Sequence, residues 1–185
     1  MPTEPRTATT INLAVARAAG IKCEKYDGDA GDDYVLRAMV DDPLSLKDWA
    51  VWNPTGDMND AMEAAEAVGL FKVQRDSDGK PWRWLVMQGI ADGTWLVAPM
   101  YVDGGGEVPD ICDPRYFEEK PLPIKICEAI EAQERAEWLS QCLALGWSRE
   151  LLDDMEALWQ AYHKRDGSLM TAAEAREAKE VSDAK

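Results

Sequence analysis

A single histidine limits the acid–base and nucleophilic chemistry that this chain can perform. His163 is the only one among 185 residues, so a Ser–His–Asp or Cys–His system would have to be built on it. It stands beside Tyr162, Lys164 and Arg165, near the expected end of a helix, where a cation is an ordinary stabilising feature. We therefore expect His163 to be structural, and we predict no catalytic residue and no enzymatic activity.

Four cysteines offer the next chemistry, a metal site or a reactive thiol. Cys23, Cys112, Cys127 and Cys142 are far apart and form no Cys-x-x-Cys pair. A structural zinc site takes four ligands at characteristic short spacings, which these residues do not provide. We expect reduced, mostly buried thiols and no metal.

Two glycine-containing loops resemble ligand-binding loops only in part. Asp27 and Asp29 match the first two ligand positions of a calcium-binding EF-hand, but Gly31 and Ala38 occupy two later ligand positions. The glycine run at 104–106 lacks the Gly-Lys-Ser/Thr that follows in a phosphate-binding loop. We predict that the chain has neither a metal site nor a cofactor site.

Acidic residues are the strongest compositional signal in the chain. The net charge at pH 7 is −15, and residues 26–66 carry eleven acidic and two basic side chains, a net charge of −9. Such a surface repels a phosphate backbone and attracts a basic groove on another protein, so we expect a protein partner and no direct nucleic-acid binding. A purely solubilising role is the alternative. The candidate partner-binding residues are Asp27, Asp29, Asp32, Asp33, Asp41, Asp42 and Trp49.

The stretch Trp-Asn-Pro-Thr-Gly-Asp carries the densest set of mutually consistent structural signals. It begins with Trp52, an apolar anchor, and Pro54 separates that anchor from a helix that Thr55 or Asp57 can cap. Apolar residues at helical spacing follow as far as Gly69, which suits the left-handed end of a helix. Capping, packing and helix termination account for every residue of the stretch, so we predict a structural role for it.

Hydrophobic periodicity divides the rest of the chain into helices and strands. Large apolar residues on both faces of the expected strands indicate a sheet that is covered on both sides. The fold class that we predict is α+β: an α/β/α sandwich around a small, mainly antiparallel sheet, with a C-terminal helical extension. The expected helices are residues 11–19 with Thr9 or Thr10 as cap, a short helix at 34–40, a helix from Pro121 or Pro123 to about 145, and one that Ser148 caps. The expected strands are residues 71–75, 81–87 and 94–102.

The length of the chain suits one domain with an appendage. We divide it into a flexible arm at 1–9, a core at 10–135 with an acidic insertion at about 27–48, and a helical extension at 136–185. No apolar run approaches the roughly 20 residues that span a bilayer, and the N-terminus has no apolar signal region. We therefore expect no membrane partner and a cytoplasmic location.

Four segments of the chain together resemble one known family. They are Ile-Asn-Leu-Ala-Val-Ala from Ile11, the Trp-Asn-Pro-Thr helix entry from Trp52, the Trp-rich strands, and Pro-Ile-Lys-Ile-Cys-Glu-Ala from Pro123. Over residues 10–135 they are similar to the phage ABA-sandwich domain, a group of small bacteriophage and prophage proteins without an established activity. The resemblance implies phage origin, expression inside a bacterium and an α/β/α core, and it carries over no functional residue. The acidic insertion and residues 136–185 depart from the family pattern and are the natural places for a function specific to this protein.

Charge and resemblance together predict a phage accessory protein that binds a host protein or nucleoprotein complex with a basic surface. The acidic surface would mimic nucleic acid and inhibit, stoichiometrically, a defence complex of the CRISPR or restriction type in the host cytoplasm. One alternative is a protein that sequesters a small molecule or nucleotide, with Trp49 or Trp52 stacked on a base. Another is a homo-oligomeric structural or assembly protein, a homodimer paired through an apolar helical stripe at 151–162.

Overall fold

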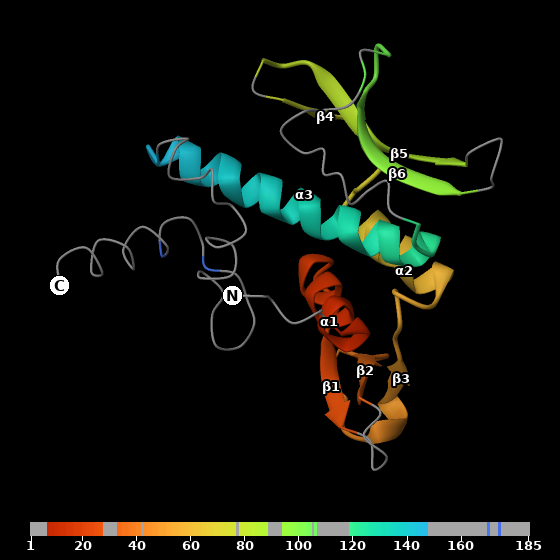
Figure 1. The fold of residues 1–185 in the computed structure, drawn as a ribbon. Helices are drawn as coiled ribbons and strands as arrows, with labels where there is room; N and C mark the ends of the chain where they lie inside the picture. The colour runs from red at the N-terminus through yellow and green to blue at the C-terminus, as the bar shows by residue number, and fades with distance from the viewer. Residues whose placement is uncertain are drawn as a thin grey trace, which may run out of the picture. The chain divides into compact units, whose positions relative to one another are not determined.

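The computed structural model describes residues 7–27, 33–41, 43–76, 78–88, 94–104, 106, 119–147, 170 and 174. The chain divides into two compact units, Met1–Ala132 and Gln133–Lys185. The strands form two antiparallel three-stranded sheets, sheet A (β1–β2–β3) and sheet B (β4–β5–β6), which Figure 1 shows with the helices. The expected α+β class with antiparallel strands and a C-terminal helix is confirmed, and the strands divide between two sheets where the sequence predicts one.

Helix α1, Ala8–Ala18, begins three residues before the expected start. Thr7 is its N-cap, and the Thr7 hydroxyl accepts a hydrogen bond from the backbone N–H of Thr10 at 3.3 Å. The predicted caps, Thr9 and Thr10, therefore lie inside the helix. Its buried face, which includes Val15, packs on sheet A, over which α1 lies in Figure 1.

Sheet A consists of β1 (Cys23–Asp27), β2 (Asp33–Ala38) and β3 (Trp49–Val51), joined in that order. The pairs are antiparallel, and the register places Tyr34 opposite Tyr26. The acidic insertion therefore begins as a β-hairpin.

The short helix predicted at 34–40 is wrong, because β2 occupies most of that segment. A helix of seven residues is marginal in water, since the cost of starting it is spread over few hydrogen bonds. Tyr34 and Val35 are instead the aromatic and β-branched types that favour paired strands, and they gain a full set of partners on β1.

Helix α2, Met58–Ala67, is the helix expected after the Trp-Asn-Pro-Thr-Gly-Asp stretch. Asp57 is its N-cap, and one carboxylate oxygen accepts hydrogen bonds from the backbone N–H groups of Asn59 at 2.7 Å and Asp60 at 3.4 Å. Gly69 has a φ of +67° and Leu70 behind it is fully buried, so the helix ends as predicted.

Sheet B is a meander of β4 (Gln74–Arg75), β5 (Pro81–Gln88) and β6 (Trp95–Tyr101). The two long strands agree with the expected strands, whereas β4 is shorter than its prediction. Trp82 and Trp84 lie on one face of β5, and both are buried in the core. From their place on strands we expected Trp82, Trp84 and Trp95 to pack in the core. That prediction is confirmed for the first two, whereas Trp95 on β6 is 37% exposed.

Helix α3, Leu122–Ala144, begins between the two prolines that were expected to open it. Its first part belongs to the unit Met1–Ala132 and its second part to the unit Gln133–Lys185. In the second unit, the indole N–H of Trp138 donates to the carbonyl oxygen of Met170 at 2.7 Å, and its ring lies edge-on to that of Trp147. His163, the helix that Ser148 was expected to cap and the stripe at 151–162 lie outside the described residues.

The core of the first unit takes side chains from both sheets, from α1 and α2 and from the first part of α3. Figure 1 shows the helices of this unit between sheet A and sheet B. Small side chains on α2 allow close packing at the centre, and the largest buried side chains are tryptophans. The core residues are Val15, Ala16, Val35, Trp52, Ala61, Ala64, Ala65, Leu70, Trp82, Trp84, Val97, Ile126, Cys127, Ala129, Ile130 and Ala132.

A buried hydrogen-bonded junction joins α1 to the turn before α2. Asn12 in α1 is 5% exposed; its amide nitrogen donates to Asn53 Oδ1 at 3.0 Å, and its Oδ1 accepts from the backbone N–H of Thr55 at 3.1 Å. The Thr55 hydroxyl donates to the same Asn53 oxygen at 3.0 Å. Gly56 must lack a side chain, because a Cβ there would clash with the amide of Asn53. Two of the segments that carry the family resemblance are therefore in direct contact.

Replacing Asn12 with alanine should lower the free energy of unfolding by about 2–3 kcal/mol, because the buried N–H of Thr55 then loses its acceptor. Urea denaturation measures the change. Asn59→Ala is the matched control, because Asn59 is exposed in the first turn of α2 and its loss should cost no more than about 0.5 kcal/mol. Equal effects of the two substitutions would show that the junction does not stabilise the fold.

Candidate protein-binding surface

The two faces of sheet A differ in what covers them. Side chains alternate along a strand, and residues paired across strands point to the same face. One face belongs to the core, where Val35 is 1% exposed. The opposite face is only partly covered and includes residues from all three strands. We call it the outer face of sheet A, and it consists of Glu24, Tyr26, Tyr34, Leu36, Trp49 and Val51.

A stacked tyrosine pair is the most distinctive part of the outer face. Tyr26 and Tyr34 are cross-strand partners whose ring centroids are 5.3 Å apart at an interplanar angle of 27°. They are 39% and 37% exposed. Large aromatic side chains are enriched at protein interfaces because each covers much area with few rotatable bonds. This pair therefore has the composition and the accessibility of an interface anchor.

Exposed aliphatic side chains continue from the outer face into the connection between β2 and β3. Val51 lies on the face itself, and Leu44 and Leu46 in the connection are 90% and 68% exposed. Asp48 orders this connection, since its Oδ2 accepts hydrogen bonds from the backbone N–H groups of Leu44 and Ser45 at 3.1 and 3.0 Å. The carboxylate of Asp48 thus organises its own loop, and the leucines remain accessible.

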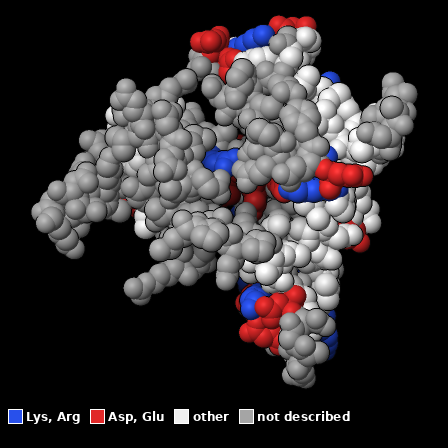
Figure 2. Space-filling model, in the orientation of Figure 1, with Lys and Arg blue, Asp and Glu red and all other residues white. Residues whose placement is uncertain are grey.

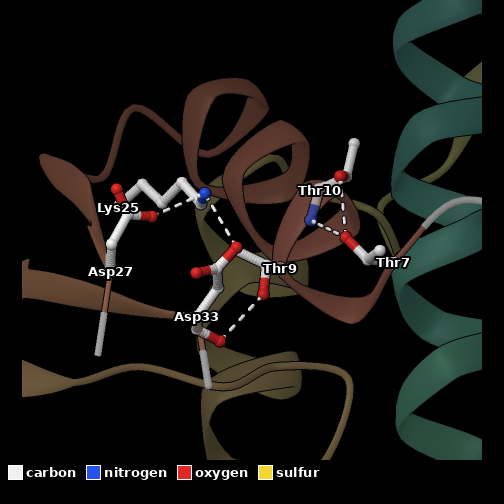
Figure 3. A network of polar contacts seen from close by, with 6 residues as sticks. All are labelled: Thr7, Thr9, Thr10, Lys25, Asp27 and Asp33. Carbon is white, nitrogen blue, oxygen red and sulfur yellow. Dashed lines mark hydrogen bonds and ion pairs between the residues drawn. The ribbon is translucent and has the colours of Figure 1, made fainter. Parts of the chain in front are cut away.

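Two of the predicted acidic residues are brought together at the end of the β1–β2 hairpin. Asp27 and Asp33 are cross-strand partners, and Lys25 forms ion pairs with both, at 2.6 and 2.7 Å (Figure 3). The hydrogen bond from Lys25 holds the pKa of Asp27 below its usual range, and the hydrogen bonds to Asp27 and Asp33 raise the pKa of Lys25. These three side chains carry a net charge of −1, so half of this acidic pair's charge is neutralised within the chain.

The same cluster is tied to helix α1. Figure 3 shows the Thr9 hydroxyl donating to the backbone carbonyl oxygen of Asp33 at 3.0 Å. The same figure shows the contact between Thr7 and Thr10, whose hydroxyl oxygens are 2.9 Å apart. The first turn of α1 therefore holds the start of β2 in place.

The other predicted partner-binding residues are spread over sheet A. Trp49 lies on β3, opposite Ala38, and is half-buried on the outer face; Asp41 is exposed just after β2. Asp29, Asp32 and Asp42 lie outside the described residues. In Figure 2, acidic and basic atoms adjoin one another at the end of the unit that sheet A occupies, which agrees with the ion pairs of Lys25.

The candidate residues predicted from the sequence do not include the two tyrosines. A helix over 34–40 would separate Tyr34 from Leu36 by about 200° around its axis, whereas a strand places both on one face. Alternation on either side of the Asp/Gly-rich loop, Glu24 and Tyr26 before it and Tyr34 and Leu36 after it, is the signal that identifies a hairpin with this face.

The tryptophans differ in whether they could contact a ligand. Trp52 is 1% exposed and belongs to the core, so its ring cannot stack on a bound base in this structure. Trp49 is half-buried, and part of its ring is accessible on the outer face. The structure thus removes one of the two stacking residues considered for a nucleotide site.

Three of the four cysteines are described, and all three are free thiols. Burial raises the pKa of Cys23 and of Cys127 to about 12 and that of Cys142 to about 11. Cys127 and Cys142 are buried as expected, whereas Cys23 is half-buried on β1. These thiols are protonated at neutral pH, which makes them weak nucleophiles. Cys112 lies outside the described residues.

Within the described ranges, no three His, Cys, Asp or Glu side chains are grouped so that they could hold a metal ion. The helices of the same ranges are too short or too polar to cross a bilayer. Comparison with known proteins finds no match to a family model, to a curated protein or to a solved structure.

Replacing Lys25 with methionine should return the pKa of Asp27 to the usual aspartate range, because the hydrogen bond from Lys25 is its main cause of depression. An NMR titration of the side-chain carboxyl measures it, with Lys22→Met as the matched control for loss of an exposed lysine from the same segment. Since the folded pKa of Asp27 is lowered, its contribution to stability is present above the usual aspartate pKa and is lost as the pH falls through the lowered value. The stability difference between wild type and Lys25→Met should shrink over that acidic range, and a difference that stays constant would contradict the ion pair.

The described thiols should react slowly with a disulfide reagent while the protein is folded. With Cys112→Ser removing the fourth thiol, the native chain at pH 8 should react about a hundredfold more slowly than the chain unfolded in urea, because burial keeps the thiols protonated. Release of the thiolate chromophore from the reagent follows the reaction. A fast native phase of one equivalent would mean that one of these cysteines is an accessible, activated thiol.

Proposed function

We propose that this chain is a phage accessory protein that acts by stoichiometric binding to a host protein with a basic surface. The observation that carries the proposal is the net charge of −9 over residues 26–66, a segment whose first part folds as the hairpin of sheet A. A compact acidic surface of this kind accelerates encounter with a basic partner and disfavours nucleic acid. The partner class favoured by the phage resemblance is a host defence complex of the CRISPR or restriction type, with the host cytoplasm as the place of action.

The arrangement of the acidic residues affects how such binding would work. Simple mimicry of a phosphate backbone needs carboxylates without cations beside them. Asp27 and Asp33 instead both form ion pairs with Lys25. The outer face of sheet A, on the other side of the same hairpin, adds exposed aromatic and aliphatic side chains and the carboxylate of Glu24. The combination supports a protein interface that joins apolar contacts to charge over a surface that acts by charge alone.

Nucleotide sequestration is less well supported. The buried position of Trp52 leaves Trp49 as the remaining stacking candidate of the two, and the surrounding acidic field opposes a phosphorylated ligand. The homo-oligomer alternative depends on residues 151–162, outside the described ranges.

Capture of a partner from a bacterial host lysate tests the proposal. We expect the tagged wild-type chain to retain a host protein at low salt, to lose part of it at moderate salt because exposed charges are screened, and to form a complex of fixed stoichiometry by native mass spectrometry. Failure to retain any partner, or retention that ignores salt, would contradict the proposal.

Two variants of equal net charge locate the effect. Asp29→Asn/Asp32→Asn/Asp41→Asn removes three charges from the insertion, and Asp78→Asn/Glu119→Gln/Glu137→Gln removes three exposed charges outside residues 26–66, so both chains change from −15 to −12. The first variant should lose more of the complex and show weaker salt dependence than the second. Equal losses would assign the effect to net charge, and not to the acidic insertion.

A further inference from the structure

We propose that the outer face of sheet A, centred on the stacked pair Tyr26–Tyr34, receives an arginine-rich segment of the basic partner. This inference rests on the proposed function and adds the surface and the chemistry by which the partner is recognised. Three properties of the described residues support it: exposed aromatic rings, the adjacent carboxylate of Glu24 and the rigidity of the hairpin.

The tyrosine rings supply the attractive surface. Tyr26 and Tyr34 are each more than a third exposed. Their strands are held by the stacking of the two rings and by the core on the other face of the sheet. A guanidinium group is planar and weakly hydrated, so it stacks on an aromatic face and keeps its N–H groups available for hydrogen bonds. An ammonium group is more strongly hydrated and lacks this planar contact. The rings therefore favour arginine over lysine.

A carboxylate lies where a stacked guanidinium could reach it. Glu24 is on the outer face, two residues before Tyr26 on β1, and its side chain is exposed. Asp27, Asp33 and Lys25 alternate with the tyrosines and lie on the opposite face of the sheet, with Val35. Glu24 is therefore the described carboxylate of the outer face that stands beside the tyrosine pair.

The hairpin holds these groups in a fixed geometry before any partner arrives. The Lys25 bridge, the Tyr26–Tyr34 pairing and the bond from Thr9 to the Asp33 carbonyl oxygen all constrain the same end of the sheet. A preformed surface avoids most of the ordering cost that a flexible loop would incur on binding.

Charge excludes the other occupants of this face. A second copy of the chain would bring two acidic surfaces together, each chain carrying −15, and like charges in contact oppose association. A nucleic acid or an anionic lipid surface is repelled for the same reason. A basic protein segment is the occupant whose charge complements Glu24 and the acidic segment at 26–66.

Two synthetic peptides test the preference, one of six Arg-Gly repeats and one of six Lys-Gly repeats, which carry equal charge. We expect the arginine peptide to bind the full chain more tightly than the lysine peptide by fluorescence anisotropy. Amide chemical-shift changes should concentrate on Glu24, Tyr26, Tyr34, Leu36 and Val51. Equal affinity for both peptides, or shifts elsewhere in the chain, would overturn the proposal.

Paired substitutions separate the ring from its apolar area. Tyr26→Leu/Tyr34→Leu keeps the apolar character and should weaken the arginine peptide about tenfold, the effect of losing two exposed cation–π contacts. Tyr26→Phe/Tyr34→Phe keeps the rings and should bind like wild type. Met87→Leu/Val102→Leu, at exposed positions in and just after sheet B, is the matched control and should bind like wild type. Binding that survives in the leucine pair would overturn the proposal. Native amide spectra of the leucine pair establish that its weaker binding does not come from unfolding.

These experiments distinguish failure of this docking surface from failure of the proposed function. A wild-type chain that captures no host protein refutes the function, whatever the peptides do. A leucine pair that still captures the host partner with wild-type salt dependence leaves the function intact and refutes this docking surface. Concentration-dependent self-association with shifts on the same face would replace the basic partner with a second copy.

Discussion

The buried amide of Asn12 is the interaction on which much of the first unit depends. It is inaccessible to water, so its donor and acceptor must both be satisfied inside the protein, and only the turn from Asn53 to Thr55 meets both. The backbone N–H of Asn53 in turn donates to Asp60 at 2.8 Å, which couples the turn to the first turn of α2. One side chain thus positions α1, the turn that follows Trp52 and the start of α2 relative to one another.

The position of α1 determines which face of sheet A is available. Because α1 packs on the side of Val35, the alternation of the strands presents Tyr26 and Tyr34 on the other side. Thr9, in the first turn of α1, also reaches the start of β2. The exposed aromatic pair is therefore a consequence of the core arrangement.

Elements with strong local signals could be predicted from the sequence. Asp57 and Gly69 bound α2 through capping and a left-handed residue, the prolines open α3, and the apolar alternation of β5 and β6 indicates strands, because each signal acts within a few residues. The division of the strands into two sheets could not be predicted, since β2 depends on pairing across a loop whose composition favours no particular partner.

The candidate site was predictable in charge and not in geometry. The acidic excess and Trp49 follow from composition and position alone. The pairing of Lys25 with both Asp27 and Asp33 requires the hairpin register, which places three residues that are up to eight positions apart within ion-pair distance. The stacked tyrosines require the same register. A single incorrect assignment, helix for strand at 34–40, therefore concealed both features.

The Lys25 bridge has a consequence for how the protein can change. It joins the last residue of β1 to the first residue of β2 through one ammonium group. Because all three side chains are exposed, the bridge contributes little to the stability of the sheet, so a substitution of Lys25 can change the charge of this group from −1 to −2 while the sheet stays folded.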